Sequence, residues 1–218
     1  MALDQNTISI VHPMAYPGPG NTDSVLRSEA DADYLFRSVT RILEDPYFSG
    51  IELTHIKNRE HRTHIAKLLK KSDMREIVFA CQPVQLINEE RIIDPGDIGS
   101  TDDNEREKAV TRIVDLLEEA VEIGATKITL LSGRDPAYGV DEPARTAELR
   151  ERGEVGLVRS LDTICREADK HGVTVVLEVF DRRYEEAGPK YFKGQLIGPT
   201  TDAVRVAENL RFERGHSN

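Results

Sequence analysis

The residue best suited to chemistry is Glu178, which ends the apolar segment VTVVLE at residues 173–178. The two-residue alternation of a strand places Glu178 on the same face as Thr174 and Val176. A carboxylate there is costly to bury unless it is paired, protonated or bound to a cation. Two interpretations stay open. Glu178 is an oxygen ligand for a hard divalent metal and also a base, or it forms a salt bridge with a neighbour such as Arg182.

Three further candidates lie where predicted strands end. His12 and His55 lie at the carboxyl ends of the first two predicted strands, where we expect them to face the same mouth as Glu178. Each is either a substrate contact or ligand, or a hydrogen-bonded structural histidine. Arg134, in the segment SGRDP after the fourth strand, either binds a phosphate or carboxylate through its guanidinium or pairs with nearby acids.

Strands and helices must position these residues. Short β-branched segments predict strands at residues 7–11, 50–55, 76–81, 127–131 and 173–179. Amphipathic segments predict helices at residues 31–43, 58–71, 105–123 and 143–170, and a further helix that begins at Thr200 or Thr201. Thr101 or Asp102 can cap the third helix, and Gly124 can end it. This alternation, without hairpin signals, predicts an α/β chain with parallel strands.

Two architectures fit this order: an open, doubly wound sheet of five strands, or part of an eightfold β/α barrel. The predicted strands begin about 42 residues apart, so eight units would need over ~300 residues, whereas a typical barrel has about 250. The chain has 218 residues. Length alone therefore favours the open sheet.

The composition limits the classes of function. With 39% apolar residues the chain can form one core, and we expect a single domain over residues 1–218. The net charge of −10 and the lack of a long basic run disfavour nucleic-acid binding. No segment has the character of a signal peptide or a membrane span, and the two cysteines lack CxxC spacing. We expect a cytoplasmic protein with no membrane partner.

Several segments, taken in order, resemble a known family. They are SIVHP at the first strand, GIELTH at the second, EIGATKITLLSG into the fourth, VTVVLEVFDR at the fifth, and LIGPTTDAVRVAENL after it. Their order and spacing are similar to those of the sugar phosphate isomerase/epimerase family, the xylose isomerase-like TIM barrels that include ketose 3-epimerases. The resemblance reverses the preference between architectures. It implies an incomplete barrel of about five to six βα units, truncated at its carboxyl end relative to the family.

The resemblance also implies a site. In the family's epimerases a glutamate ending the fifth strand ligates a divalent metal, commonly manganese, magnesium, cobalt or zinc, and acts as the proton-transfer base. That role maps onto Glu178, and the acid and arginine that often follow match Asp181 and Arg182. A glutamate that contacts substrate hydroxyls six residues after the ligand has no direct match, since Tyr184 stands there and Glu185 follows it. The family's other ligands come from the sixth to eighth strands, which the sequence does not show.

The first hypothesis is therefore a metal-dependent isomerase or epimerase that acts on a small sugar or sugar phosphate by proton transfer next to a carbonyl. The alternative is a catalytically silent partial barrel that acts as a homo-oligomer or interaction module, because an open barrel exposes sheet edges. An abasic-site nuclease of the wider superfamily ranks third, because the net charge of −10 opposes it.

Overall fold

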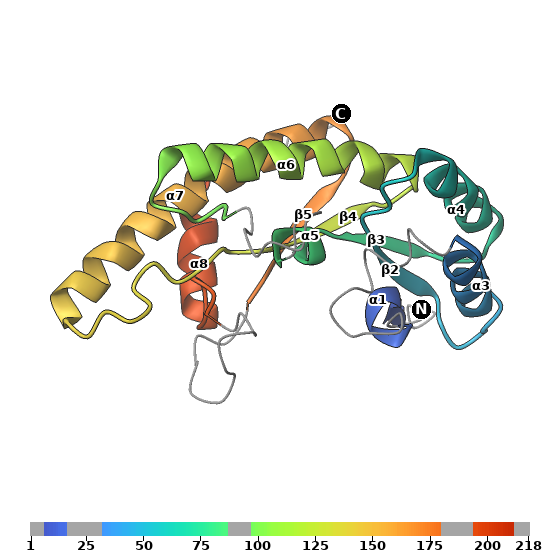
Figure 1. Cartoon of the computed structure of the whole chain (residues 1–218), viewed down its shortest axis with the longest axis horizontal. Coiled ribbons are helices and arrows are strands. Elements are labelled where there is room, and N and C mark those ends of the chain that lie inside the picture. The colour runs from blue at the N-terminus through green and yellow to red at the C-terminus, as the bar shows by residue number, and fades with distance from the viewer. Residues whose placement is uncertain (1–6, 17–31, 87–96, 180–193, 212–218) are drawn as a thin grey trace, which may run out of the picture.

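The structure, a computed structural model, describes residues 7–16, 32–86, 97–179 and 194–211. Five parallel strands form one sheet in the order β1-β2-β3-β4-β5 (Figure 1). The strands are β1 (Ser9–Val11), β2 (Gly50–Thr54), β3 (Glu76–Ala80), β4 (Lys127–Leu131) and β5 (Thr174–Glu178). The described helices are α1 (His12–Ala15), α3 (Ala32–Leu43), α4 (Arg59–Lys71), α5 (Gln82–Leu86), α6 (Asp103–Glu122), α7 (Pro143–Lys170) and α8 (Thr200–Asn209). The predicted parallel α/β fold is confirmed.

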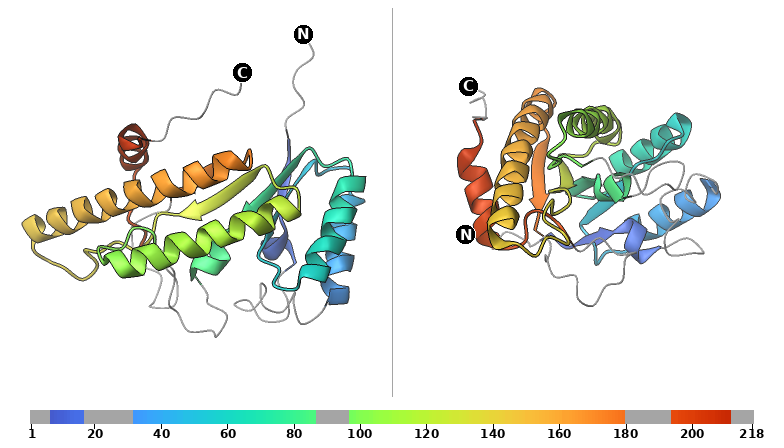
Figure 2. Two further views of the ribbon diagram at one scale, coloured as in Figure 1. Left: turned by 90° about the horizontal axis from the view of Figure 1, so that it is seen from above. Right: turned by 60° about the vertical axis from the view of Figure 1, so that its left-hand side comes forward.

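The strand order distinguishes the two architectures. A doubly wound sheet reverses its strand order at a switch point and carries helices on both faces. Here each strand pairs with the next one along the chain, and α3, α4, α6 and α7 cover one side of the sheet (Figure 2). The chain is therefore wound as a segment of a β/α barrel, which confirms the incomplete barrel that the resemblance implies. The open sheet that chain length alone favoured is wrong. Length could not decide because it carries no information about the order of the strands.

The strand register defines two faces of the sheet. Ile51 pairs with Ile77, and Leu53 pairs with Phe79, which in turn pairs with Ile128. These side chains share one face. All but Ile77 belong to the hydrophobic core, and Ile77 packs against it. We call this the outer face, because it packs against the helices, and we call the opposite side the inner face. Since side chains alternate along a strand, the register assigns every strand residue to one of the two faces.

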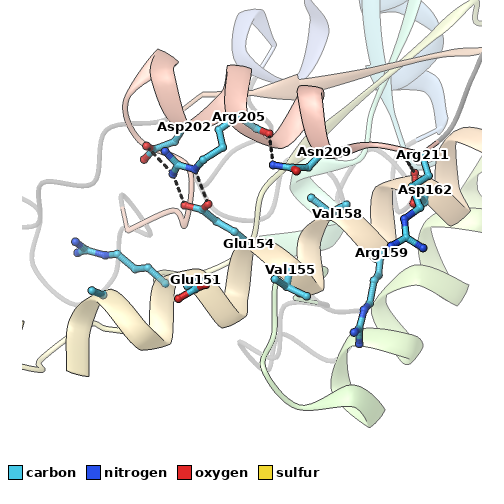
Figure 3. Close-up of a pocket in the computed structure, with 12 residues that line it drawn as sticks. Glu151, Glu154, Val155, Val158, Arg159, Asp162, Asp202, Arg205, Asn209 and Arg211 are labelled. Carbon is cyan, nitrogen blue, oxygen red and sulfur yellow. Dashed lines mark hydrogen bonds and ion pairs between the residues drawn. The ribbon is translucent and has the colours of Figure 1, made fainter. Parts of the chain in front are cut away.

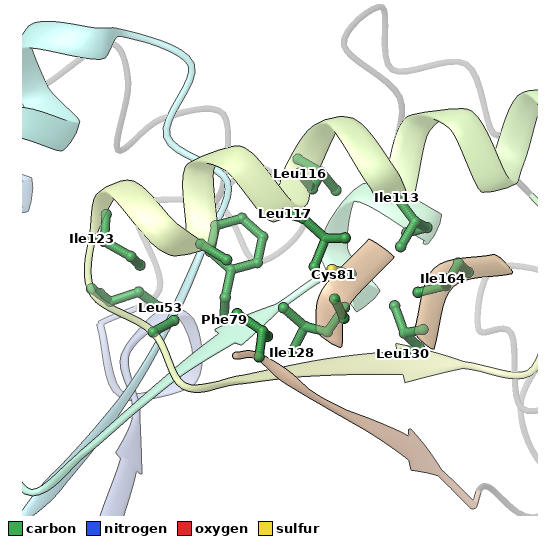
Figure 4. Close-up of a cluster of buried hydrophobic side chains, with 14 of the residues drawn as sticks. Leu53, Phe79, Cys81, Ile113, Leu116, Leu117, Ile123, Ile128, Leu130 and Ile164 are labelled. Atoms are coloured by element: carbon green, nitrogen blue, oxygen red, sulfur yellow. The ribbon is translucent and has the colours of Figure 1, made fainter. Parts of the chain in front are cut away.

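The core lies between the outer face and α6. Figure 4 shows side chains of α6 lying over those of β3 and β4. Leu116 and Leu117 are at most 1% exposed, as are Phe79 and Ile128 beneath them. Each such side chain contributes about 1.5–3 kcal/mol by leaving water. This contact fixes the sheet relative to its helices.

Local signals set the ends of α6 as predicted. The Asp102 carboxylate accepts hydrogen bonds from the backbone N–H groups of Asn104 and Glu105 at 2.8 and 3.1 Å. Gly124 follows the helix with φ +82°, a conformation that suits glycine. The helix begins at Asp103, slightly earlier than its apolar periodicity alone suggests.

The sheet has two edges. Among the described residues, β1 and β5 each pair with one strand only, so this part of the chain does not close into a barrel. Val176, on the inner face of β5, is 36% exposed. None of the described helices is long and apolar enough to cross a membrane.

Candidate active site

Glu178 lies on the inner face at the carboxyl end of β5. Its neighbours Val175 and Leu177 pack against the hydrophobic core on the outer face, as the alternation predicts. In the register Glu178 pairs with Leu131, the last residue of β4. Burial raises the pKa of the Glu178 carboxyl, and a hydrogen bond from Gln82 opposes that rise. A half-buried carboxylate of this kind is a stronger base than one in water.

Gln82 and Thr129 join Glu178 in one hydrogen-bonded chain. Gln82 begins α5, two residues after the end of β3, and its Nε2 donates to Oε1 of Glu178. The hydroxyl of Thr129, on the inner face of β4, donates to Oε1 of Gln82 at 2.9 Å. The three side chains come from β4, from β5 and from the helix that follows β3. Sequence reasoning missed Gln82 and Thr129, although alternation along 127–131 places Thr129 opposite Ile128 and Leu130.

A second carboxyl group lies on the inner face. Glu52 stands between Ile51 and Leu53, which both point to the outer face. Burial, and next the negative charge of Glu178, raise the pKa of Glu52 to about 6. The two carboxyl groups therefore interact electrostatically. The alternation within GIELT was the signal that could have identified Glu52 from sequence.

His12 does not face the inner side, contrary to the expectation from its place at the end of a strand. Its Nε2 lies 2.8 Å from the Ser38 hydroxyl on α3, and its ring stacks on Tyr16 with centroids 5.9 Å apart. His12 is buried, and burial lowers its pKa to about 4. The ring is thus neutral and held against an outer helix. A role in substrate binding is untested, and these contacts support the structural alternative.

His55 is also held against the helices. Its Nδ1 lies 2.8 Å from Oε2 of Glu119 on α6, and Nη1 of Arg62 lies 3.4 Å from the other oxygen of that carboxylate. The side chain therefore does not have the expected orientation toward the mouth, and its predicted role toward a substrate is untested. His55 is two residues after Leu53, and alternation carries it to the outer face.

Arg134 follows β4 and contacts two other loops. Its backbone N–H donates to Oδ2 of the buried Asp97 at 3.2 Å, and the residue forms an antiparallel bridge with Gln195. Arg134 itself is exposed. Its predicted role toward a phosphate or carboxylate stays a prediction. Arg182 and Glu185 lie outside the described residues.

The described residues do not by themselves fit a divalent metal. They contain no group of three or more His, Cys, Asp or Glu side chains arranged to hold an ion. Glu178 and Glu52 supply carboxylate oxygens, but one oxygen of Glu178 is occupied by Gln82. Hard divalent cations need about six oxygen ligands in a defined geometry. Any metal site would therefore require ligands from beyond this part of the chain.

A groove of about 800 Å³ lies elsewhere, between α7 and α8 (Figure 3). Its centre is a closed ion-pair cluster in which Arg205 contacts Glu154 at 2.6 Å and Asp202 at 2.9 Å. None of the inner-face residues named above lines it. Its charges neutralise one another, so the groove is not the site that Glu178 indicates.

Comparisons place this geometry among known folds. Residues 36–205 match the sequence model of the family described as xylose isomerase-like TIM barrel. No curated protein sequence matches the chain. An L-ribulose 3-epimerase structure superimposes with a TM-score of 0.57 and 20% identity, over 84% of this chain and 53% of that one. A D-tagatose 3-epimerase-like protein gives a TM-score of 0.59 and 15% identity, over 81% of this chain and 57% of that one.

A third similar structure is named for a different activity. It is an AP endonuclease of family 2 from Brucella melitensis, with a TM-score of 0.57 and 16% identity over 94% of this chain and 65% of that one. The chain spans little more than half the length of the two epimerase structures. At these identities the similarity shows the fold, and the activity has to be argued from the site.

Proposed function

The chain belongs to the xylose isomerase-like TIM barrel family, and on this basis we propose an isomerase or epimerase that acts on a small sugar or sugar phosphate. The observation that carries the proposal is the half-buried Glu178 on the inner face at the carboxyl end of β5. Catalytic groups of β/α barrels lie at this end of the strands. The epimerases among the similar structures make a sugar the first substrate class to test.

The proposed reaction is a proton transfer next to a carbonyl. The Glu178 carboxylate takes a proton from the carbon beside the carbonyl, so a C–H bond breaks and an O–H bond forms. The electron pair moves to the carbonyl oxygen and gives an enediolate. Return of the proton to the other face inverts the carbon. Return to the neighbouring carbon moves the carbonyl, and the hydroxyl proton of the first carbon then passes to the former carbonyl oxygen. Burial of Glu178 favours this step because it raises the proton affinity of the carboxylate.

Glu52 supplies a second proton-holding group on the same face. Its pKa of about 6 leaves a fraction of molecules protonated just below neutral pH. Pairs of carboxyl groups with different proton affinities are a common basis for acid–base chemistry. We assign Glu52 to the supply or return of a proton and Glu178 to its removal.

Metal dependence is a separate part of the proposal. Glu178 is the carboxylate that would ligate manganese, magnesium, cobalt or zinc, and the other ligands would come from outside the described residues. A bound divalent cation would polarise the carbonyl and hydroxyl of the substrate. The proton transfer above is argued from the carboxyl groups of the chain alone.

Hydrogen exchange tests the reaction without knowledge of the product. Small ketoses and ketose phosphates are incubated with the protein in D₂O, and proton NMR follows the loss of the signal next to the carbonyl. We expect exchange with at least one substrate and a fall of about 10²–10⁴-fold in Glu178→Gln. Glu118→Gln, an equal charge change at an exposed position of α6, is the control. The absence of exchange in the wild-type protein, with and without added Mn²⁺, would overturn the proposal.

A second candidate function is an interaction module without catalysis. It is favoured by the two sheet edges among the described residues and by the exposed Val176 on the inner face. Unpaired edges invite pairing with another chain, including a second copy. Sedimentation velocity tests this candidate: we expect a defined oligomer and no hydrogen exchange. A monomer that catalyses exchange would exclude it.

A further inference from the structure

Gln82 is placed to control the orientation of the Glu178 carboxylate. It is the first residue of α5, and its side chain spans from the end of β3 to the end of β5. Its amide has one donor end and one acceptor end, so its orientation decides whether the NH₂ group or the carbonyl oxygen faces Glu178. With Nε2 toward Glu178, the amide donates a hydrogen bond to the carboxylate. The reverse orientation would turn the amide oxygen toward a negative charge, which is unfavourable.

Thr129 selects the favourable orientation. Its hydroxyl donates to Oε1 of Gln82 at 2.9 Å, so the amide oxygen is held toward β4. The N–H end then faces Glu178 on β5. Thr129 lies on the inner face of a central strand, and it is buried. A buried hydroxyl that donates a hydrogen bond holds its acceptor in place, because breaking the bond would leave both groups unpaired away from water.

Gln85 fixes the helix from which Gln82 projects. Its side-chain amide pairs with the backbone of Leu131 in both directions, with Nε2 donating to the carbonyl at 3.0 Å and Oε1 accepting from the N–H at 2.8 Å. Leu131 is the register partner of Glu178. The short helix α5 is therefore anchored to β4 beside the carboxylate that Gln82 contacts.

We propose that Gln82 is a positioning residue for Glu178: oriented by Thr129, its N–H group holds Oε1 of the carboxylate and leaves Oε2 to exchange the proton. The proposal deepens the proposed function and rests on it for the proton-exchange role. Gln82 thus holds Glu178 in one orientation on the inner face.

The test measures the pKa of Glu178 by ¹³C NMR of the full chain labelled at glutamate carboxyl carbons. The Glu178 signal is assigned by its loss in Glu178→Gln. In Gln82→Met, which keeps the length and removes the donor, we expect the pKa of Glu178 to rise by about one unit. Thr129→Val should shift it in the same direction by less, because the amide becomes free to turn. Thr163→Val, at an exposed position of α7, is the matched control.

Exchange kinetics distinguish this proposal from the proposed function. If wild-type exchange occurs, Gln82→Met should lower its rate by about tenfold and move its pH profile upward with the pKa of Glu178. An unchanged pKa of Glu178 in both Gln82→Met and Thr129→Val overturns the positioning role, whether or not the protein catalyses exchange. A raised pKa supports the positioning contact even if the wild-type protein proves inactive, which overturns the proposed function alone. Because Thr129→Val keeps Gln82, the test stands even if Gln82→Met fails to fold.

Discussion

Nδ1 of His55 lies 2.8 Å from Oε2 of Glu119, so a hydrogen bond joins the residue after β2 to the last turn of α6. The side chains are 7% and 14% exposed, and the contact therefore lies at the edge of the core. Arg62 approaches the same carboxylate at 3.4 Å. This cluster fastens β2 and α4 to α6 on the outer face, away from the side that Glu178 occupies.

Replacement of His55 should affect stability first. In His55→Phe the Glu119 carboxylate loses a buried partner and keeps Arg62, so we expect the free energy of unfolding to fall by about 1–3 kcal/mol. Urea unfolding followed by circular dichroism measures this change. Unchanged stability together with loss of substrate proton exchange in D₂O would instead assign His55 to substrate binding.

His12 should make stability depend on pH. Its pKa is about 4 in the fold and 6.5 in the unfolded chain, so the unfolded chain binds the proton more tightly. The contribution is full above pH 6.5 and is lost as pH falls from 6.5 toward 4, at a total of about 3 kcal/mol. His12→Gln should remove this dependence in urea unfolding measured across that range. An equal slope in the variant would contradict the burial of a neutral ring.

Asp97 should have the opposite effect on the pH dependence of stability. Burial raises its pKa from 3.8 to about 6, although the N–H groups of Gly99 and Arg134 donate to the carboxylate and oppose that rise. The folded state therefore holds the proton more tightly. This contribution is full below pH 3.8 and is lost as pH rises through 6. In Asp97→Asn, stability should rise more steeply with pH over this interval than in the wild type. An unchanged slope would show that Asp97 titrates normally in the fold.

Gly133 should be much less tolerant of alanine than Gly139. Both have positive φ, +93° and +75°. A Cβ at Gly133 would lie 1.9 Å from Oδ1 of Asp97, whereas a Cβ at Gly139 meets nothing within 4 Å. We expect Gly139→Ala to lower the free energy of unfolding by about 1 kcal/mol from backbone strain alone. Gly133→Ala should lower the free energy of unfolding clearly more. Equal losses would contradict the close packing of Gly133 against Asp97.

The electrostatic coupling of Glu52 and Glu178 can be measured directly. Burial is the larger cause of the raised pKa of Glu52, and the charge of Glu178 is the smaller one. In Glu178→Gln we therefore expect the pKa of Glu52 to fall below about 6 and to stay above 4.5. ¹³C NMR titration of the Glu52 carboxyl gives this value. No change would mean that the two groups do not share the inner face.

Glu178, His12 and His55 all lie at or just after the carboxyl end of a strand, and position along the chain alone predicts one shared mouth. Alternation separates them: Glu178 follows Leu177 and faces inward, whereas His12 and His55 fall on the face of Ile10 and Leu53. The same local rule, applied at every strand, would have placed both histidines against the helices.

Local patterns in the sequence were enough to determine the strands, the helices, the cap at Asp102 and the inward face of Glu178, because each depends on residues close together in the chain. They could not determine that Gln82, Thr129 and Glu178 form one hydrogen-bonded chain, since these residues come from three different parts of the sequence. Only the tertiary structure brings them together, through a strand order and register set by packing of the outer face against α6. The winding of the chain as a barrel segment was likewise decided by which strands pair, a property of the assembled sheet and not of any one segment.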